Sequence, residues 1–511
     1  MTRVRIKQGG REWSLTAETG ALLSELLLGA GHPPEMPCGG EGRCGKCRVR
    51  VSGALSPPDA AERRALGEAA LDAGFRLACR ARVLGEAAVE LPEAGETAVL
   101  LEAAAQVRPE APLFRRYGVA VDIGTTTLAA RLYGPAGELA RAGMRNPQAA
   151  RGADVISRIS YALAGGGAEL RETVRRAIGT LVRRLAAKAK VRAEEIDAFV
   201  LTGNTCMLYL LTGSDPDCLS RAPFEASRRF GETLGAEELS LPAAPGAKAY
   251  LPRCISAFVG ADIVTALLAA RLCDRGETAL LADIGTNGEV VLFREGRLLC
   301  CSTAAGPAFE GAGLSCGMPG LPGAIDRVTE SGGRLCFHVL GGGPARGLCG
   351  SGAVDLVAEL LRRGALEESG LFAAEAEAFA LPEGLALTQR DVRMIQLAKS
   401  AVSAGIRTLL RRTGTPPEAV ARLAVAGGFG SYLDLANAAE IGLLPRELLP
   451  RTEVLGNAAL AGAAELLCDR ELLARTEALA DGAETVELSG DADFLEYYTA
   501  GMLFEREADR G

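Results

Sequence analysis

The chain has 511 residues, of which 48% are hydrophobic and 23% charged, an ordinary composition for a globular protein of about three or four domains. Its formal net charge of −8 and pI near 5.3 argue against nucleic acid as the main partner, because phosphate-binding surfaces are normally basic. The sequence opens without a signal-like segment and has no uncharged apolar run of about 18 residues, so we expect a cytoplasmic protein without membrane contact.

The first 92 residues predict a small β-rich domain. Residues 2–18 are typical of a hairpin with Gly9 and Gly10 at its turn, and an apolar helix follows over about 21–28. A glycine-rich loop, PCGGEGRCGKC, comes next and leads into the strand CRVRVSGAL. A later segment, FRLACRARV, lies near the start of another strand.

Four cysteines in this region have the spacing C-x5-C-x2-C-x31-C, namely Cys38, Cys44, Cys47 and Cys79. A [2Fe-2S] cluster takes four thiolates, and a tight loop can bring three of them to one side of it. The glycines of the loop allow close curling, so that backbone N–H groups can point at the cluster sulfurs. The alternative is a structural zinc site, although such sites usually show paired C-x2-C knuckles. The pattern favours an iron–sulfur centre that carries electrons.

Residues 1 to about 92 resemble the plant-type ferredoxin domain, a β-grasp fold. The first gap of five residues departs from the C-x4-C-x2-C spacing of plant-type ferredoxins and leaves the reduction potential open. We expect most of the other ten cysteines to be buried thiols.

Beyond a predicted linker at 93–116, rich in Ala, Glu and Pro, the chain repeats itself. Residues 119–127 are VAVDIGTTT and residues 280–288 are LLADIGTNG, at an offset of 161 residues. An offset this long indicates a duplicated domain and not a solenoid.

Each copy predicts a buried strand, an aspartate, a Gly-Thr turn and a second strand. Glycine allows close backbone approach, and the N–H and hydroxyl groups of such a turn can donate to phosphate oxygens. Asp122 and Asp283, at the strand ends, can hold Mg²⁺ through water. A purely structural hairpin explains one copy equally well, whereas two copies facing across a cleft favour nucleotide binding. The candidate phosphate-binding residues are Gly124, Thr125, Thr126, Thr127, Gly285, Thr286 and Asn287.

These features resemble the acetate and sugar kinase, heat-shock and actin superfamily, in which two RNase H-like lobes clamp ATP. The resemblance implies an adenosine loop, for which AVAGGFG offers Gly427 and Gly428, although a plain strand-to-helix turn is the alternative. It also implies two connecting helices, which we assign to the segments that start at Leu201 and Val454. Glu289 and Glu310 are both candidates for a general base, with Asp122, Asp283 and Glu289 as the predicted catalytic set.

The expected fold is a multidomain α+β and α/β chain, a β-grasp ferredoxin domain followed by two RNase H-like lobes. The expected division is 1–92 (ferredoxin), 93–116 (linker), 117–254 (first lobe), 255–475 (second lobe) and 476–511 (C-terminal extension).

Over essentially its whole length the chain resembles the reductive activators of corrinoid proteins. The resemblance lies in NPQAARGADVISRI, ADIGTNGE, AAGPAFEGAG, LCGSGAVDLVAELL and QLAKSAVSAGI. Tyr209 stands where family members often have histidine, so no role is carried over to it. Only Cys468 follows Cys349, so we expect the N-terminal cluster to be the only one. The loop 304–320 is either a docking loop for the partner or an internal crossover.

The resemblance implies ATP-dependent, one-electron reduction of a corrinoid from Co(II) to Co(I), with a [2Fe-2S] cluster, ATP and Mg²⁺ as cofactors. The implied partners are the corrinoid protein of a methyltransferase system, an upstream electron donor and a second copy of the chain in a homodimer. Two alternatives stay open: an ATP-gated electron donor to another low-potential acceptor enzyme, and a redox-sensing, nucleotide-dependent binding module. A small-molecule kinase is weaker, since a ferredoxin would add nothing to phosphoryl transfer.

Overall fold

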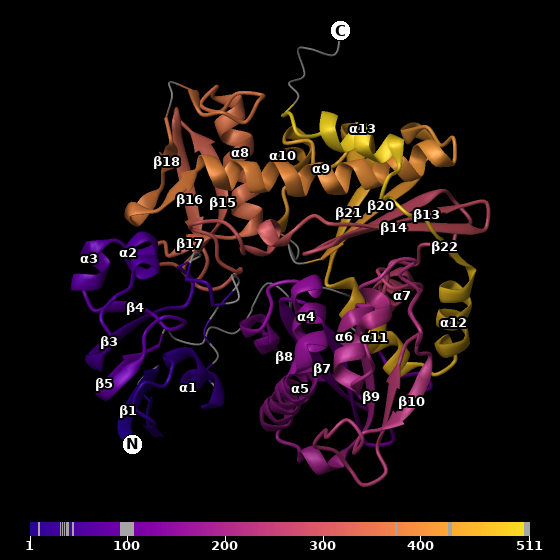
Figure 1. Ribbon diagram of the computed structural model, residues 1–511. Coiled ribbons are helices and arrows are strands. Elements are labelled where there is room, and N and C mark those ends of the chain that lie inside the picture. The colour runs from indigo at the N-terminus through magenta and orange to yellow at the C-terminus, as the bar shows by residue number, and fades with distance from the viewer. Residues whose placement is uncertain are drawn as a thin grey trace. The chain divides into compact units, whose positions relative to one another are not determined.

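The structure of the protein is a computed structural model that describes residues 1–8, 11–30, 32, 34, 36, 40–42, 45–91, 107–373, 376–427 and 432–504. The chain forms two compact units, Met1–Glu96 with Pro147–Thr173 and Thr97–Asn146 with Val174–Gly511. In the part of the chain that the structure describes, unit 1 has one sheet and unit 2 has several (Figure 1). Each unit also has its own hydrophobic core. Among the described residues, no helix is both long and apolar enough to cross a bilayer.

Unit 1 contains a mixed sheet of five described strands in the order β2-β1-β5-β3-β4. β1 and β2 form the predicted antiparallel hairpin, and β5 runs parallel to β1. The turn glycines of this hairpin, Gly9 and Gly10, lie outside the described residues. The elements are β1 (Thr2–Gln8), β2 (Arg11–Ala17), α1 (Leu23–Gly29), β3 (Arg48–Leu55), α2 (Ala60–Leu66), α3 (Glu68–Asp72), β4 (Phe75–Leu77) and β5 (Val83–Glu90).

Alternating apolar positions build the core of this sheet. Val4 and Ile6 of β1 point to the same face, because side chains two apart in a strand share a face, and both are fully buried. They belong to one apolar cluster with Leu23 and Leu27 of α1. Burial of each such side chain contributes about 1.5–3 kcal/mol, so the helix is held on the sheet mainly by packing. The arrangement confirms the predicted ferredoxin-type fold.

Residues 147–173 complete unit 1. They form η2 (Pro147–Ala150), α4 (Val155–Tyr161), the π-helical turn η3 (Ala162–Gly166) and the start of α5 (Gly167–Ala189). Arg151 donates two hydrogen bonds to Glu25 of α1, at 2.9 and 2.8 Å, and one to Glu169 at 2.8 Å. The Tyr161 hydroxyl donates to Glu169 at 2.6 Å. This segment lies within the first lobe predicted for 117–254, whereas its contacts here include the helix of the ferredoxin-type sheet.

Unit 2 contains two six-stranded sheets in its described part, with the orders β10-β11-β9-β6-β7-β8 and β21-β20-β12-β13-β14-β22. β6 and β12, the two DIGT strands, each pair antiparallel with the next strand and parallel with a later one, β9 and β20 respectively. In register, Ile123 lies opposite Gly203 and Ile284 opposite Gly427. This equivalence confirms the duplicated RNase H-like lobes.

The strands of the first sheet are β6 (Tyr117–Ile123), β7 (Thr127–Gly134), β8 (Gly137–Arg145), β9 (Ile196–Gly203), β10 (Glu232–Gly235) and β11 (Lys248–Leu251). Those of the second are β12 (Ala279–Ile284), β13 (Gly288–Arg294), β14 (Arg297–Thr303), β20 (Arg422–Gly427), β21 (Thr452–Gly456) and β22 (Ala483–Thr485). Smaller sheets contain β15 (Ala324–Ser331), β16 (Arg334–Val339), β17 (Gly347–Leu348), β18 (Ala378–Ala380) and β19 (Ala386–Thr388).

Two helices, α7 (Ala261–Ala269) and α11 (Ala458–Cys468), pack against each other between the two large sheets. α11 covers the first sheet, and α7 belongs to a core cluster with the second. A Cβ at Gly462 would lie 1.8 Å from the Thr265 carbonyl oxygen, so only glycine permits this approach. α11 agrees with the connecting helix predicted from Val454. The helix expected from Leu201 is wrong for this role: that segment ends β9 and forms α6 (Thr205–Thr212), which packs on its own lobe.

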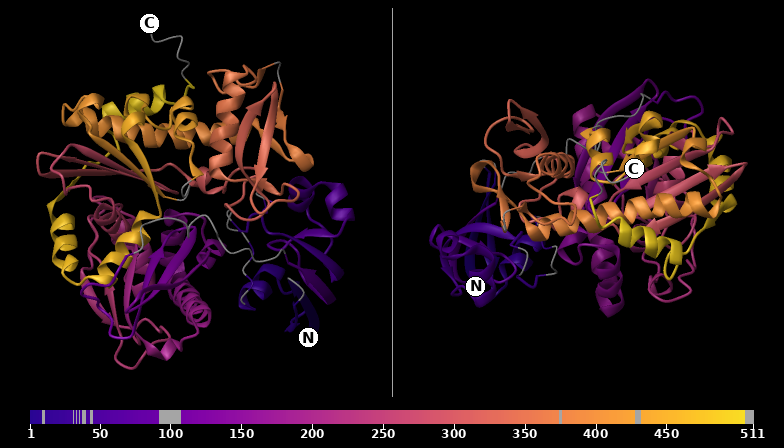
Figure 2. Two further views of the ribbon diagram at one scale, coloured as in Figure 1. Left: turned by 180° about the vertical axis from the view of Figure 1, so that it is seen from behind. Right: turned by 90° about the horizontal axis from the view of Figure 1, so that it is seen from above.

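The remaining helices cover the outer side of the second lobe. α9 (Gln389–Arg412) is the long orange helix along one face of the second sheet, and α13 (Ala492–Ala500), in yellow, lies beside it (Figures 1 and 2). α9 contains QLAKSAVSAGI, one of the stretches that carry the family resemblance. The others are α8 (Gly350–Arg362), α10 (Leu435–Glu440) and α12 (Leu472–Gly482).

Candidate functional site

A backbone hydrogen bond closes each DIGT turn, over three residues in the first turn and over two in the second. In the first, the Gly124 N–H donates to the Thr127 carbonyl at 2.9 Å, and in the second the Gly285 N–H donates to the Asn287 carbonyl at 3.0 Å. A Cβ at Gly124 would lie 2.6 Å from the Thr127 carbonyl oxygen, which explains the glycine in the first turn. Each turn therefore follows a buried strand and carries threonine, three residues in the first turn and one in the second.

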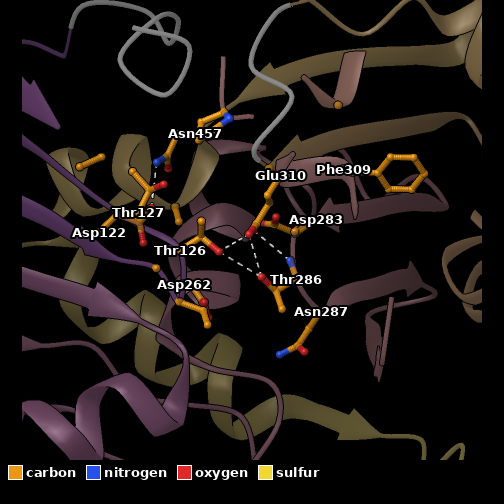
Figure 3. A pocket seen from close by; sticks show the side chains of 18 of the residues that line it. Asp122, Thr126, Thr127, Asp262, Asp283, Thr286, Asn287, Phe309, Glu310 and Asn457 are labelled. Carbon is orange, nitrogen blue, oxygen red and sulfur yellow. Dashed lines mark hydrogen bonds between the residues drawn. The ribbon is translucent and has the colours of Figure 1, made fainter. Parts of the chain in front are cut away.

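Both turns open into one cavity of unit 2, between the two large sheets (Figure 3). The hydroxyl oxygens of Thr126 and Thr286 are 3.3 Å apart, so the two turns meet. The cavity contains every predicted hairpin residue together with Glu289 and Gly427. Its polar and glycine lining includes Asp122, Gly124, Thr125, Thr126, Thr127, Asn204, Asp262, Asp283, Gly285, Thr286, Asn287, Glu289, Glu310, Gly350, Ser351, Gly427 and Asn457.

Two asparagines, Asn204 and Asn457, occupy equivalent places in the two lobes. Each follows the glycine that ends a strand, and each caps the next helix through its side-chain oxygen, at 3.0 Å from the Met207 nitrogen and 2.7 Å from the Leu460 nitrogen. The amide of Asn204 also donates to the Thr125 hydroxyl at 3.0 Å, and that of Asn457 to the Asp122 carboxylate at 2.8 Å. Both residues are therefore helix caps that also reach into the site.

A group of carboxylates lines the floor of the cavity. Burial raises the pKa of Asp122 to about 6, against the opposing hydrogen bond from Asn457. Burial, and then the charges of Asp122 and Glu310, raise the pKa of Asp283 to about 7. Burial followed by the neighbouring carboxylates also raises the pKa of Asp262 and of Glu289 well above their ordinary values. Like charges this close favour either protonation or a bound cation.

Asp262, in the first turn of α7, was not among the sequence candidates. It belongs to neither DIGT copy, and the only local signal is an acidic residue in the first turn of a helix, which is common. In the described residues, no three Asp, Glu, His or Cys side chains lie close enough to hold a metal ion among them. Mg²⁺ gives up water reluctantly, so a Mg²⁺ ion at carboxylates that cannot ligate it together would have to keep most of its water shell.

Glu310 lies directly on the two turns, at the end of the 3₁₀ helix η6 (Pro307–Glu310) (Figure 3). Its carboxylate accepts hydrogen bonds from the Thr286 N–H at 3.0 Å, from the Thr286 hydroxyl at 2.8 Å and from the Thr126 hydroxyl. Glu289 is 8% exposed on β13 and accepts from the Ser302 hydroxyl at 3.4 Å. Of the two glutamates, Glu310 is the one that bonds to both turns, whereas Glu289 bonds to Asn287 of the second turn.

Gly427 ends β20 beside the second turn. Its φ is +114°, and a Cβ there would lie 2.2 Å from the Ile284 carbonyl oxygen, so a side chain is excluded. Gly428, the second residue assigned to adenosine, lies outside the described residues. The N-terminus of α8, with Gly350 and Ser351, also faces the cavity, and such a terminus favours anions.

The described part of the cysteine region brings Cys47 and Cys79 together. Cys47 precedes β3 and Cys79 follows β4, and pairing of Arg48 with Leu77 draws both cysteines to one end of these strands. The Ala78 N–H donates to the Cys47 carbonyl at 2.9 Å. The two sulfur atoms are 3.2 Å apart, and the residues are 2% and 4% exposed. Cys38 and Cys44 lie outside the described residues.

This pair fits two ligands of one iron atom. For metal–thiolate bonds of about 2.3 Å in a tetrahedron, two sulfurs lie roughly 3.8 Å apart, so a small outward movement of each is sufficient. Of the loop glycines, Gly40, Gly42 and Gly45 have φ values of +89°, +78° and +70°. The curled backbone expected for a cluster loop is therefore present at these three positions.

Comparison with known proteins gives the same division of chemistry. Residues 6–84 match the 2Fe-2S iron-sulfur cluster binding domain, residues 117–275 the RACo middle region, and residues 277–510 the C-terminal domain of RACo, the ASKHA domain. The chain is 34% identical over 421 residues to the corrinoid activation enzyme RamQ of Eubacterium limosum, across 76% of this chain and 70% of that protein.

It is 25% identical over 435 residues to the [Co(II) methylated amine-specific corrinoid protein] reductase of Methanosarcina barkeri, across 76% of this chain and 78% of the relative. The solved structure of a reductive activator for corrinoid, iron-sulfur protein superposes with a TM-score of 0.72 at 27% identity, covering 99% of this chain and 98% of that one.

Fold and site together define an iron–sulfur protein with an actin- and sugar-kinase-type ATPase core. Within that class, the chain belongs to the family of corrinoid activation enzymes, the reductive activators of corrinoid proteins.

Proposed function

We propose that this protein reduces the cobalt of a corrinoid protein from Co(II) to Co(I), using an N-terminal [2Fe-2S] cluster and MgATP. The observation that carries the proposal is the presence in one chain of a buried cysteine pair in a ferredoxin fold and of two facing DIGT turns in one cavity. Family membership supports the choice of corrinoid as acceptor.

The electron site consists of Cys38, Cys44, Cys47 and Cys79. When bound, the cluster supplies one electron at a time, and an upstream low-potential one-electron donor restores it. The cobalt of the partner gains that electron, and no bond to the protein forms or breaks. We infer that Cys47 and Cys79 hold the same iron, because the pairing of β3 and β4 brings their sulfur atoms within 3.2 Å.

The nucleotide site is the cavity of unit 2. The turn residues Gly124 to Thr127 and Gly285 to Asn287 would donate to phosphate oxygens, and Gly427 and Gly428 would pass beneath adenosine. Asp122 and Asp283 would hold Mg²⁺ through water, with Glu289 beside them. Because the turns belong to different lobes, a phosphate bound between them would couple nucleotide binding to the separation of the lobes.

The free-energy cost of the electron transfer explains why a nucleotide would be needed. A plant-type cluster has a potential near about −400 mV, and an electron moved against about 100 mV requires roughly 2.3 kcal/mol. A coupling free energy between two sites is typically about 1–3 kcal/mol. Nucleotide binding can therefore offset a mismatch of this size by favouring the partner conformation in which cobalt is more easily reduced. ATP acts here as a switch.

We infer that the corrinoid protein belongs to a methyltransferase system and that the activator works as a homodimer. The ferredoxin domain would span 1–92, followed by the linker 93–116, the lobes 117–254 and 255–475, and the extension 476–511.

The decisive experiment mixes the dithionite-reduced protein with a Co(II) corrinoid protein and follows the Co(I) absorption band with and without MgATP. We expect the band to grow only with both the cluster and MgATP. Cys79→Ser should lose the cluster absorption and the reduction while still binding nucleotide, whereas Cys336→Ser, at an exposed strand position, should retain both. No Co(I) with any corrinoid protein, but MgATP-dependent reduction of another acceptor, would overturn the corrinoid assignment.

A further inference from the structure

The carboxylate of Glu310 occupies the donors that a phosphate would need. Its Oε1 accepts the N–H of Thr286 at 3.0 Å, and its Oε2 accepts the hydroxyls of Thr286, at 2.8 Å, and of Thr126. Figure 3 shows the side chain between the two turns, with its dashed hydrogen bonds converging from both lobes. Glu310 therefore connects the first lobe to the second through one carboxylate.

These donors cannot serve two acceptors. A threonine hydroxyl and a backbone N–H each have a single hydrogen to donate, and a carboxylate, like a phosphate oxygen, only accepts. Thr125 has a different partner, since its hydroxyl accepts a hydrogen bond from Asn204 at 3.0 Å. A phosphate held by Thr126 and Thr286 and the carboxylate of Glu310 thus exclude each other, and their like charges reinforce the exclusion.

We propose that Glu310 is an internal competitor of the nucleotide phosphate: its carboxylate clamps the two DIGT turns together and has to leave them when nucleotide binds. This inference depends on the proposed function, because it assigns the same turns to phosphate. It makes Glu310 a positioning and regulatory residue of the nucleotide site.

The backbone around Glu310 couples this exchange to the loop 304–320. The Gly306 N–H donates to the Thr286 carbonyl at 2.8 Å, and a Cβ at Gly350 would lie 1.9 Å from the Phe309 carbonyl oxygen, so η6 is packed between the second turn and α8. At the far end of the loop, Ser315 donates from its backbone N–H to the buried Asp391 of α9 at 2.7 Å. Glu310 is therefore an attachment point in a loop that is also held at Gly306 and Ser315, and its withdrawal would release that attachment.

The first test measures MgADP affinity of the full-length, cluster-loaded protein by calorimetry. Glu310→Ala leaves the donors without their internal acceptor and should bind MgADP about tenfold or more tightly than wild type. Glu289→Gln changes the other glutamate of the same cavity, which bonds to Ser302 and Asn287 and not to the hydroxyls of Thr126 and Thr286, and should give a clearly smaller gain. Glu310→Gln keeps the size of the side chain and one acceptor, and should fall between the wild type and the alanine variant.

The second test measures hydrogen exchange of the loop 304–320. In wild type, MgADP should increase exchange in this loop, while in Glu310→Ala exchange should already be high and change little on adding nucleotide. Equal or weaker affinity in Glu310→Ala than in Glu289→Gln, with wild-type exchange in the loop, would overturn the inference. If Glu310→Ala does not fold, the Glu310→Gln comparison decides the same question. A wild-type protein that binds no nucleotide at all would instead remove the proposed function.

Discussion

Asn457 and Asp122 join the two lobes of the core across their shared cavity: the amide of Asn457 donates to the carboxylate of Asp122 at 2.8 Å. Asp122 is the penultimate residue of the first DIGT strand, and Asn457 caps α11, which follows the second sheet but packs on the first. Its counterpart Asn204 reaches Thr125 within the first lobe. The duplication therefore places one amide within a lobe and the other across the lobes.

The raised pKa of Asp283, about 7 against 3.8 for the ordinary side chain, predicts a stability that depends on pH. Folding disfavours the charged form of Asp283. The neutral carboxyl therefore makes its full contribution to the free energy of unfolding below about pH 4, and this contribution is lost as the pH rises through about 7. Asp283→Asn cannot ionise and should gain stability relative to wild type between pH 5 and 8, by about 1–2 kcal/mol after screening by cavity water.

Urea unfolding of the wild type and of Asp283→Asn at pH 5 and at pH 8, with chelator present, measures this difference in the free energy of unfolding. The conservative substitution leaves the other carboxylates in place. A stability difference that is the same at both pH values would contradict the assigned pKa.

The contact of α7 with α11 predicts that Gly462→Ala is strongly destabilising. The added methyl group would meet the Thr265 carbonyl oxygen at 1.8 Å, so the helices must separate, with an expected loss of about 3 kcal/mol or more. Gly179→Ala is the matched control, because its nearest contact is an ordinary 3.4 Å from Pro242 and alanine favours the helix α5 by up to about 1 kcal/mol. Thermal unfolding compares them, and equal midpoints would refute the close packing.

A buried ion pair between α2 and β4, the strand that leads to Cys79, predicts a second effect on stability. Glu62, 1% exposed, accepts two hydrogen bonds from Arg76, at 2.9 and 2.8 Å, and one from the Leu77 N–H at 3.0 Å. Arg76→Met should leave the Glu62 carboxylate buried without its cation, at a cost of about 3–5 kcal/mol, and should release the cluster at lower temperature. The visible absorption of the cluster during heating reports this.

An exposed pair provides the control for that experiment. Arg63 and Glu68, on the surface of the same unit, are joined at 2.6 Å, and breaking such a pair changes stability little because water screens both charges. Arg63→Met should therefore lose the cluster at the wild-type temperature. A similar loss in both variants would show that the buried pair has no special role.

The ion pair of Arg151 and Glu25 predicts that charge governs the attachment of residues 147–166 to the ferredoxin-type sheet. Arg151→Glu should raise hydrogen exchange in this segment severalfold and leave the cluster spectrum unchanged, because the cysteines lie on other elements. The double variant with Glu25→Arg restores opposite charges and should recover part of the protection. No recovery would indicate that packing, and not charge, holds the segment.

The local parts of the site were predictable from sequence and its long-range contacts were not. Each DIGT turn is specified by neighbouring residues, and the repeat itself predicted that Asp122 and Asp283 would be equivalent. Glu310, by contrast, meets Thr126 across 184 residues, and nothing near it in the chain indicates that contact. Of the two central helices, α11 was predicted and α7 was not. The fit of Gly462 against Thr265 depends on two segments that only the fold brings together.

Asn146 connects the first DIGT turn of unit 2 to the start of the segment that belongs to unit 1. Its N–H donates to the Thr126 carbonyl at 2.8 Å and its side-chain amide to the Gly124 carbonyl at 2.9 Å, so it is pinned to the first DIGT turn. The next residue, Pro147, already belongs to unit 1, the electron-carrying unit. Arg151, a little further along the chain, donates a hydrogen bond to Glu25 of the same unit. A displacement of that turn would therefore pass from unit 2 to unit 1 through the hydrogen bonds of Asn146, a few peptide bonds and the ion pair of Arg151 with Glu25.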